Sequence, residues 1–264
     1  FDVGIAEEHG ALFACGLAAE GMKPYIAIYS TFMQRCIDMI QHDAALQKLP
    51  VRFCMDRAGL SPDDGPTHHG LFDIAMIRSI PNIVFMQPKD EAEFVHMLRT
   101  MNHYQNGPTV IRYPRGCGAG VPLPSTPEIL PIGKAEVLQT GKDVTLVSLG
   151  TMIGIARETA ALLEAQGHTV TLINARFIKP LDDECIRRHA ASSRVVCTFE
   201  DHSISGGFNS AVLESLEAGG VTTPVEAIAW PDQFIEHGSE PILRKKYGLT
   251  AEAALQKIIP HLNS

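Results

Sequence analysis

Three charged side chains stand directly after runs of residues that look like β-strands. Glu7 follows the run FDVGI, Arg57 ends the run PVRFCMDR, and Arg115 ends the run TVIRYPR. Parallel sheets place the carboxyl ends of their strands along one edge, so we expect these side chains to converge. A carboxylate there can act as a general acid or base, and two guanidinium groups can hold a phosphate monoester bidentately.

Each of these side chains also has an ordinary structural interpretation. Glu7 or its neighbour Glu8 could be a first-turn carboxylate favoured by the helix dipole, and taken alone this is the better interpretation. Arg57 and Arg115 could equally be partners in structural salt bridges. Phe32, just after another strand end, is by default a core residue, although its position also allows a stacking role.

A loop rich in Gly, Pro and Asp follows Arg57. It has the sequence AGLSPDDGPTHHG and carries Asp64, His68 and His69. The two histidines could bind a metal, but no third ligand stands at a suitable spacing. Because a loop imidazole titrates near neutral pH, proton transfer or substrate binding is the favoured interpretation.

Strand-like and helix-like segments alternate almost without interruption, which predicts mainly parallel sheets with right-handed crossovers. A Gly/Pro-rich stretch without periodicity interrupts this alternation, and we interpret it as a linker. The predicted fold class is α/β with two domains, each a mainly parallel sheet flanked by helices. The predicted domains are residues 1–117 and 132–264, joined by the linker 118–131.

Composition excludes several classes of protein. The 264 residues carry a formal net charge of −8 and are 45% hydrophobic, which is typical of a globular protein and gives no basic surface for nucleic acid. The longest apolar runs are too short to span a membrane. Six scattered cysteines without a CxxC pair favour buried thiols over a metal or redox role. Neither GxGxxG after a strand nor GxxxxGK occurs, so dinucleotide or nucleoside triphosphate binding is not indicated.

The beginning of the chain suggests a missing portion. The sequence has no initiating Met and starts inside a predicted strand at residues 1–5. Because a buried strand is a poor start for a domain, we expect an N-terminal portion to precede it.

Several motifs together resemble one family. They are IAEEH, STFMQR, DRAGLSPDDGPTHHG, RYPRG and RFIKPLD, and they are similar to motifs of the 1-deoxy-D-xylulose-5-phosphate synthases. These thiamine-diphosphate enzymes are related to transketolase and to the E1 component of pyruvate dehydrogenase. IAExH alone indicates the wider superfamily, whereas STFxQR, the DRAG loop and RYPRG are specific to the synthases. The resemblance covers essentially the whole chain and implies an N-terminally incomplete pyrimidine-binding domain followed by a transketolase-like C-terminal domain.

The resemblance also implies a role for each matching residue. Glu7 corresponds to the catalytic acid that hydrogen-bonds N1′ of the aminopyrimidine, and Glu8 stands at a position without a role. Phe32 corresponds to the aromatic residue that stacks on the same ring. The other implied roles are lining of the cofactor pocket by Tyr29 and Arg35, catalysis near the reacting carbons by Asp64 and His68, and binding of the substrate phosphate by Arg57 and Arg115.

The implied reaction condenses pyruvate with glyceraldehyde 3-phosphate, with loss of carbon dioxide, to 1-deoxy-D-xylulose 5-phosphate. This product is a precursor of isoprenoids, thiamine and pyridoxal. The implied cofactors are thiamine diphosphate and Mg²⁺, whose ligands would lie in the missing N-terminal diphosphate-binding portion, so this chain should supply no metal ligand. The resemblance further implies a homodimer in the bacterial cytoplasm or, in a plant, in the plastid stroma. We expect this chain to be inactive alone.

Two classes of alternative to the synthase stay open at this point, another thiamine-diphosphate enzyme and a protein without enzymatic activity. An E1 β-type subunit or the C-terminal half of a split transketolase would also lack the diphosphate domain. An E1 β-type subunit has no phosphorylated acceptor, however, and so has no need for Arg57 and Arg115. The non-enzymatic alternative is a stable fragment that binds partners without turnover.

Overall fold

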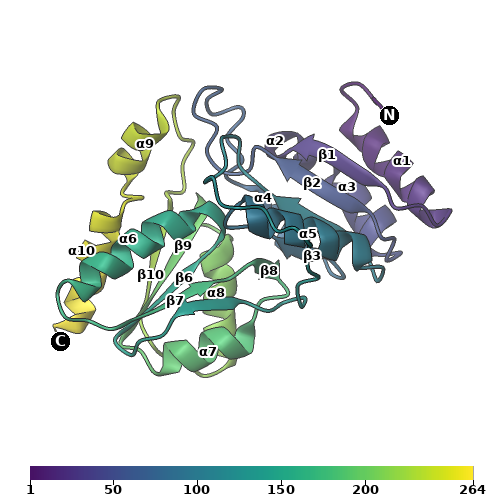
Figure 1. The fold of residues 1–264 in the computed structure, drawn as a ribbon. Coiled ribbons are helices and arrows are strands. Elements are labelled where there is room, and N and C mark those ends of the chain that lie inside the picture. Colours follow the sequence, from purple (N-terminus) through teal and green to yellow (C-terminus); the bar gives the residue numbers. More distant parts are fainter. Residues whose placement is uncertain (264) are drawn as a thin grey trace.

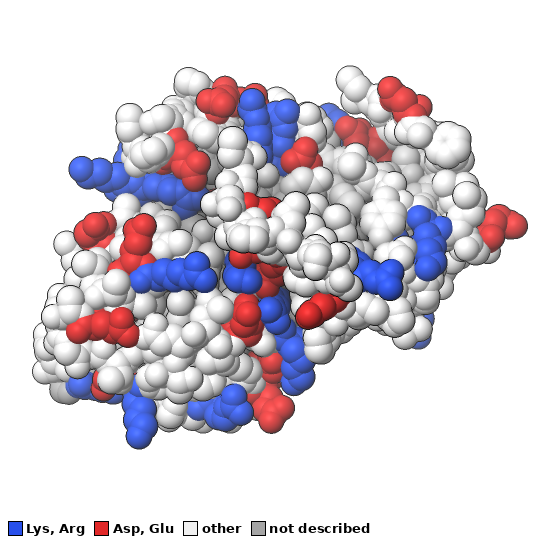
Figure 2. All heavy atoms as spheres, viewed as in Figure 1, with Lys and Arg blue, Asp and Glu red and all other residues white. Residues whose placement is uncertain are grey.

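The computed structural model describes residues 1–263 and consists of two α/β halves packed side by side (Figure 1). Each half contains a five-stranded, mostly parallel sheet flanked by helices. This confirms the fold class that the alternation of segments predicts. In the described part of the chain, no helix is both long and apolar enough to cross a membrane. On the face shown in Figure 2, Lys and Arg side chains are interspersed with Asp and Glu and form no continuous basic area.

The first sheet has the strand order β1-β2-β4-β3-β8. Its first four strands run parallel, so their carboxyl ends lie along one edge, as the sequence predicts. Within the described residues β1 is an edge strand, with β2 on one side and the other side free. The strands are β1 (Tyr25–Tyr29), β2 (Arg52–Asp56), β3 (Val84–Met86), β4 (Thr109–Arg112) and β8 (Phe177–Lys179).

The helices of the first half cover its sheet. The segment after β1 is a run of short helical pieces, one of them a π-helix. α5 begins where the Asp90 side chain accepts a hydrogen bond from the Glu93 N–H at 2.8 Å, which caps the helix. The helices are α1 (Glu7–Ala19), α2 (Ser30–Met33), η1 (Gln34–Cys36), α3 (Ile37–Met39), η2 (Ile40–Ala45), α4 (Asp73–Arg78) and α5 (Glu91–His103).

The second sheet has the strand order β10-β9-β6-β7-β5, and only its last strand is antiparallel to its neighbour. Helices α6 and α10 pack together on it, and α7 and α8 form a second packed pair (Figure 1). The strands are β5 (Glu136–Gln139), β6 (Val144–Ser148), β7 (Val170–Asn174), β9 (Val195–Ser203) and β10 (Val225–Trp230). The helices are η3 (Gly150–Met152), α6 (Ile153–Glu164), α7 (Asp183–Ala191), α8 (Phe208–Ala218), α9 (Glu240–Tyr247) and α10 (Ala251–Leu262).

The two halves share a strand and a core. β8 follows the second half's β7 in sequence, yet it pairs antiparallel with β3 of the first sheet. The largest apolar cluster contains Phe53 and Phe85 from the first sheet together with Ile186 of α7 and Phe208 of α8. The linker 118–131 contains no helix or strand among its described residues, but it does not separate two independent cores.

Residues 1–6 do not form the strand that the alternation of Phe1, Val3 and Ile5 predicts. They have no regular secondary structure, and Phe1 and Ile5 are exposed. Gly4 adopts a φ of +67°, and its N–H donates to Asp2 Oδ1 at 2.8 Å, so the chain turns there. A strand needs a neighbouring strand to satisfy its backbone groups, and these residues do not pair with β1.

The free energy of unfolding should depend on pH through two buried histidines, His69 and His202. Burial lowers the pKa of both imidazoles, so they are neutral in the folded chain and become protonated in the unfolded chain below its pKa of about 6.5. The unfolded state then binds more protons, so stability is fully present above about pH 6.5 and decreases as pH falls towards the folded pKa values.

We therefore expect the free energy of unfolding, measured by urea denaturation, to rise between about pH 5 and pH 6.5 by up to about 1.4 kcal/mol per pH unit for each histidine. The slope should be smaller for His69→Gln than for the wild-type chain. A flat profile in the wild-type chain would contradict this prediction.

Candidate active site

Glu7 begins α1, and its side chain is only 11% exposed. The Arg35 guanidinium donates a hydrogen bond from Nη1 to Glu7 Oε1 at 3.0 Å. Arg35 lies in η1, shortly after the carboxyl end of β1. This ion pair connects the first turn of α1 to the segment that follows β1 and fixes the direction of the Glu7 carboxylate.

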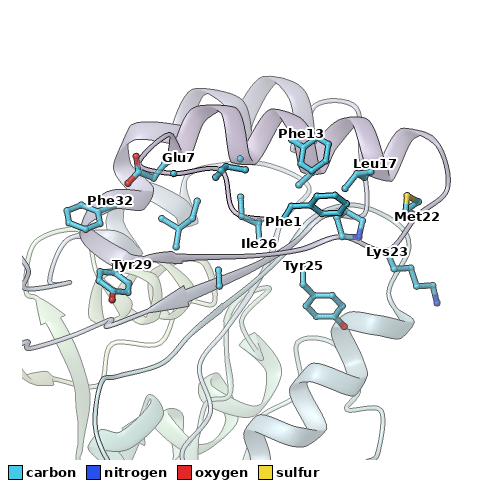
Figure 3. Close-up of a pocket in the computed structure, with 17 residues that line it drawn as sticks. Phe1, Glu7, Phe13, Leu17, Met22, Lys23, Tyr25, Ile26, Tyr29 and Phe32 are labelled. Atoms are coloured by element: carbon cyan, nitrogen blue, oxygen red, sulfur yellow. The ribbon is translucent and has the colours of Figure 1, made fainter.

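A cavity of about 640 Å³ runs between α1 and the free edge of β1 (Figure 3). Glu7, Tyr29 and Phe32 lie together at one end of it, and the remaining lining is largely apolar, with Phe13 and Leu17 contributed by α1. Its volume is in the range of small-molecule sites. One carboxylate and two aromatic rings at the polar end suit a planar, nitrogen-containing ring.

The aromatic rings continue from the cavity to the predicted loop. The rings of Tyr29 and Phe32 stack with centroids 5.7 Å apart, and the His68 imidazole meets the Phe32 ring edge-on at 5.5 Å. The Arg35 guanidinium lies 5.0 Å from the centroid of Phe32. Phe32 is half-buried and lines the cavity, so it is not simply a core residue.

The two predicted phosphate-binding arginines converge on a single carboxylate oxygen. Arg57 Nη1 lies 2.6 Å and Arg115 Nη1 lies 3.1 Å from Asp64 Oδ2. The second Arg57 amino group donates to the Tyr29 hydroxyl at 2.8 Å. Both arginines therefore make the salt bridges expected of structural residues, and the same geometry shows that the pair can hold an anion between them.

Arg57 has an unusual backbone conformation for an arginine. Its φ of +56° lies in the left-handed region, which costs energy for a residue with a side chain. The Asp56 carboxylate accepts the Arg57 N–H at 2.7 Å and stabilises this turn at the end of β2. The strained turn occurs at the point where the chain leaves the sheet edge and enters the loop 58–70.

The loop 58–70 packs against the second half of the chain. The sequence alone did not predict this contact. Gly59 and Gly70 exchange backbone hydrogen bonds of 2.8 and 2.7 Å and close the base of the loop. A Cβ at Gly59 would lie 2.2 Å from Asp201 Oδ2, so only glycine allows β9 to approach this closely. Asp201 in turn accepts a hydrogen bond of 2.6 Å from the Trp230 indole.

A buried ion pair lies beneath the site. Arg112, at the end of β4, is completely buried, and its Nε donates to Asp73 Oδ2 at 3.1 Å. Asp73 also accepts from the Ser30 hydroxyl at 2.9 Å, and Arg112 Nη2 donates to the carbonyls of Gly70 and Asp201, each at 3.2 Å. The pair thus joins the start of α2, the loop and the second half.

The described residues contain neither a disulfide nor a cluster of side chains suited to a metal ion. All six cysteines are free, and four of them are buried. Among residues 1–263, no group of three His, Cys, Asp or Glu side chains could hold a metal ion.

Comparison with known proteins identifies two domains of one family. The pyrimidine-binding domain of transketolase matches residues 1–119, and the transketolase C-terminal domain matches residues 133–253. A solved split-gene transketolase, described as an inactive β4 tetramer, is 32% identical with a TM-score of 0.87, and the match covers 100% of this chain and 83% of that one. The transketolase of Campylobacter jejuni shares the fold with a TM-score of 0.81. It is 18% identical, and the match covers 98% of this chain and 39% of that one.

Curated relatives named 1-deoxy-D-xylulose-5-phosphate synthase are more similar in sequence. The protein of Methylacidiphilum infernorum is 55% identical over 100% of this chain, and that of Acidobacterium capsulatum is 54% identical over 99%. The chain spans about 42% of the length of each of these relatives. The resemblance carried by the sequence motifs is therefore confirmed, and the chain belongs to the transketolase family, comprises its pyrimidine-binding and C-terminal domains, and is similar along its whole length to the 1-deoxy-D-xylulose-5-phosphate synthases.

Proposed function

We propose that this chain supplies the pyrimidine-binding half of the active site of a thiamine-diphosphate-dependent 1-deoxy-D-xylulose-5-phosphate synthase. The observation that carries the proposal is the convergence of Arg57 and Arg115 on one anion beside the cavity that holds Glu7 and Phe32. Identity of 55% to a synthase along the whole chain supports it. Because the chain spans 42% of that relative, the complete activity belongs to a larger assembly.

The residues at the polar end of the cavity fit the aminopyrimidine of thiamine diphosphate. Glu7 presents a largely buried carboxylate there, and Phe32 presents a ring on which a flat heterocycle can stack. When bound, the cofactor supplies the electron sink that allows pyruvate to lose carbon dioxide and its remaining two carbons to join an aldehyde. We propose that the diphosphate and Mg²⁺ are held by the N-terminal diphosphate-binding portion of the full protein.

The roles of this chain follow from its contacts. Glu7 would hydrogen-bond the ring nitrogen N1′ and favour a proton there, and the hydrogen bond from Arg35 keeps the Glu7 carboxylate in place. Tyr29 lines the pocket and holds Arg57 through its hydroxyl. His68 contacts Phe32 at the cavity and Asp64 lies in the same loop, and we assign both residues to proton transfer near the reacting carbons.

The acceptor phosphate is the second element of the proposal. Arg57 and Arg115 already bind a carboxylate, and a phosphate with its greater charge is the stronger partner for two guanidinium groups. An acceptor such as glyceraldehyde 3-phosphate would place its phosphate between them and its aldehyde towards the cavity.

The test is an assay of pyruvate decarboxylation with and without glyceraldehyde 3-phosphate, using the chain together with the diphosphate-binding portion. We expect the acceptor to stimulate release of carbon dioxide and a pentulose phosphate to appear. If the acceptor has no effect and no pentulose phosphate forms, the proposal is wrong. The chain by itself should show no turnover, and measurable synthase activity from the 264 residues alone would refute that expectation.

Replacing Arg115 by Met should weaken binding of the phosphorylated acceptor. A charge-assisted hydrogen bond contributes about 1.5–3 kcal/mol, so we expect the KM for glyceraldehyde 3-phosphate to rise by about 10- to 100-fold. The KM for pyruvate should stay within about twofold, since pyruvate has no phosphate. Arg99→Met, an exposed arginine on α5, is the matched control. An equal rise in both KM values would contradict a phosphate-binding role.

A second candidate is the C-terminal half of a split transketolase. The split-gene relative, described as an inactive β4 tetramer, favours it and also supports self-association and inactivity of this chain alone. Its identity of 32% is lower than the 55% shared with a synthase. The two functions are separated by the donor substrate, since the synthase requires pyruvate and releases carbon dioxide.

We propose that the chain forms a homodimer within the complete enzyme, which analytical ultracentrifugation would test.

A further inference from the structure

His69 is buried in the loop that carries Asp64 and His68. The proposed function gives it no part in proton transfer or in phosphate binding. Only 2% of its surface is exposed. Its Nδ1 accepts the backbone N–H of Ser61 at 3.0 Å, so this nitrogen is unprotonated and Nε2 carries the hydrogen. Nε2 then donates to the carbonyl oxygen of Glu236 at 3.3 Å. One imidazole thus joins the two sides of the loop and connects the loop to the second half of the chain.

Within the first half of the chain, Asp64 pairs with Arg57 and Arg115, and the His68 ring meets Phe32 edge-on. Short turns hold the loop internally, with the N–H of Asp64 on the Ser61 carbonyl at 3.2 Å and the N–H of His68 on the Gly65 carbonyl at 2.9 Å. Gly65 stands at the tip with a φ of +78°, a conformation that glycine adopts without strain. Among the described residues, the hydrogen bond from His69 to Glu236 is the one that joins residues 61–69 to the second half of the chain.

The segment 231–239 of the second half forms the opposing surface. It supplies the Glu236 carbonyl, and the His237 Cβ is 3.4 Å from the Cβ position of Gly65. Phe234 meets Phe72 edge-on at 5.8 Å, just after the loop. The C-terminal domain therefore contacts the base, the tip and the end of the loop, although it contributes no side chain to the predicted catalytic group.

We propose that His69 is a positioning residue through which the C-terminal domain fixes the loop that carries Asp64 and His68. The proposal rests on the proposed function for its consequence in catalysis, because that function places Asp64 and His68 at the reacting carbons. Its structural part stands without it, since the contacts of His69 do not depend on the substrate.

Three substitutions separate the two hydrogen bonds of His69. Leu removes both bonds, Asn reaches the Nδ1 position and keeps the bond to Ser61, and Gln reaches the Nε2 position and keeps the bond to Glu236. His96→Leu is the matched control, because His96 also accepts a backbone N–H through Nδ1, that of Glu128 at 2.8 Å, but lies on α5.

The first measurement is amide hydrogen exchange on the full 264-residue chain. In His69→Leu and His69→Asn, the loop amides at residues 59–70 should exchange about tenfold faster, which corresponds to one lost hydrogen bond, while amides of both sheets keep their protection. His69→Gln should retain most of the loop protection, and His96→Leu should affect only the linker. Unchanged loop exchange in His69→Asn and His69→Leu, or an equal increase throughout the chain, would overturn the proposal.

The second measurement is steady-state kinetics with the diphosphate-binding portion supplied. We expect kcat/KM for glyceraldehyde 3-phosphate to fall about tenfold in His69→Leu and His69→Asn, with the KM for pyruvate unchanged and His69→Gln within about twofold of wild type. An equal fall in kcat/KM for pyruvate and for glyceraldehyde 3-phosphate would overturn the positioning role. So would a rate in His69→Gln as low as that in His69→Leu. A wild-type assembly without synthase activity would instead refute the proposed function, and hydrogen exchange would still decide the role of His69.

Discussion

Glu7→Gln should reduce synthase activity by about 100- to 1000-fold without unfolding the chain, because general acid–base catalysis by a positioned side chain contributes about 10²–10⁴-fold. Gln has nearly the same size as Glu and can still accept a hydrogen bond from Arg35, which lies 3.0 Å away. What it lacks is the negative charge that, in the proposed function, would favour a proton on N1′ of the aminopyrimidine. Initial rates with the diphosphate-binding portion supplied, together with the dissociation constant for thiamine diphosphate, would measure the effect.

Glu8→Gln is the matched control for this experiment. Glu8 is the next residue of the same helical turn, and the cavity lining includes Glu7 but not Glu8. We expect Glu8→Gln to keep its activity within about twofold, because its carboxylate is outside the site. Full activity in Glu7→Gln, or an equal loss in both variants, would show that Glu7 does not have the proposed role.

Arg112→Met should have the largest effect on stability. Removing one partner of a buried ion pair leaves the other charge without compensation, which costs about 3–5 kcal/mol. Here the Asp73 carboxylate would stay buried with the Ser30 hydroxyl, and the carbonyls of Gly70 and Asp201 would lose their donor. Urea denaturation would measure the free energy of unfolding, and the exposed Arg99→Met should change it by less than about 0.5 kcal/mol.

The double variant Arg112→Met with Asp73→Leu tests the physical reason. If the cost comes from an uncompensated buried charge, replacing both partners by apolar side chains should recover most of the lost stability. A loss close to the sum of the two single variants would show instead that the two side chains contribute independently, and it would contradict this explanation. In the double variant the contact between the base of the loop and β9 should still be weakened, because the carbonyls of Gly70 and Asp201 no longer have Arg112 as a donor.

The convergence of the site could be predicted from the sequence because a topological rule determines it. Arg57 and Arg115 follow strands that are recognisable by their apolar residues, and parallel strands bring such positions to one edge. The same rule could not show that both arginines meet Asp64, because a loop conformation decides that contact. The alternation of apolar residues wrongly predicted a strand at Phe1–Ile5, because this segment has no neighbouring strand with which to pair.

The groups that hold the site in place were not predictable in the same way. Arg112 has one available signal, since an arginine inside the apolar strand TVIR must be paired if the strand is buried. Its partners could not be named, because the carbonyl of Asp201 lies 89 residues away in the sequence. His69 and Glu236 are 167 residues apart. Contacts of this kind follow from how the two halves dock, which no local pattern records.

The position of β8 has a consequence for how the chain can be divided. Two family domains match separate segments, yet the second segment contributes the strand that covers the free side of β3. A protein expressed only up to the linker would present β3 as an uncovered apolar edge, which is a template for aggregation. The two domains are therefore separate units of sequence that share a sheet and an apolar core, so insertions or gene fission within residues 118–131 would have to keep both segments in the same complex.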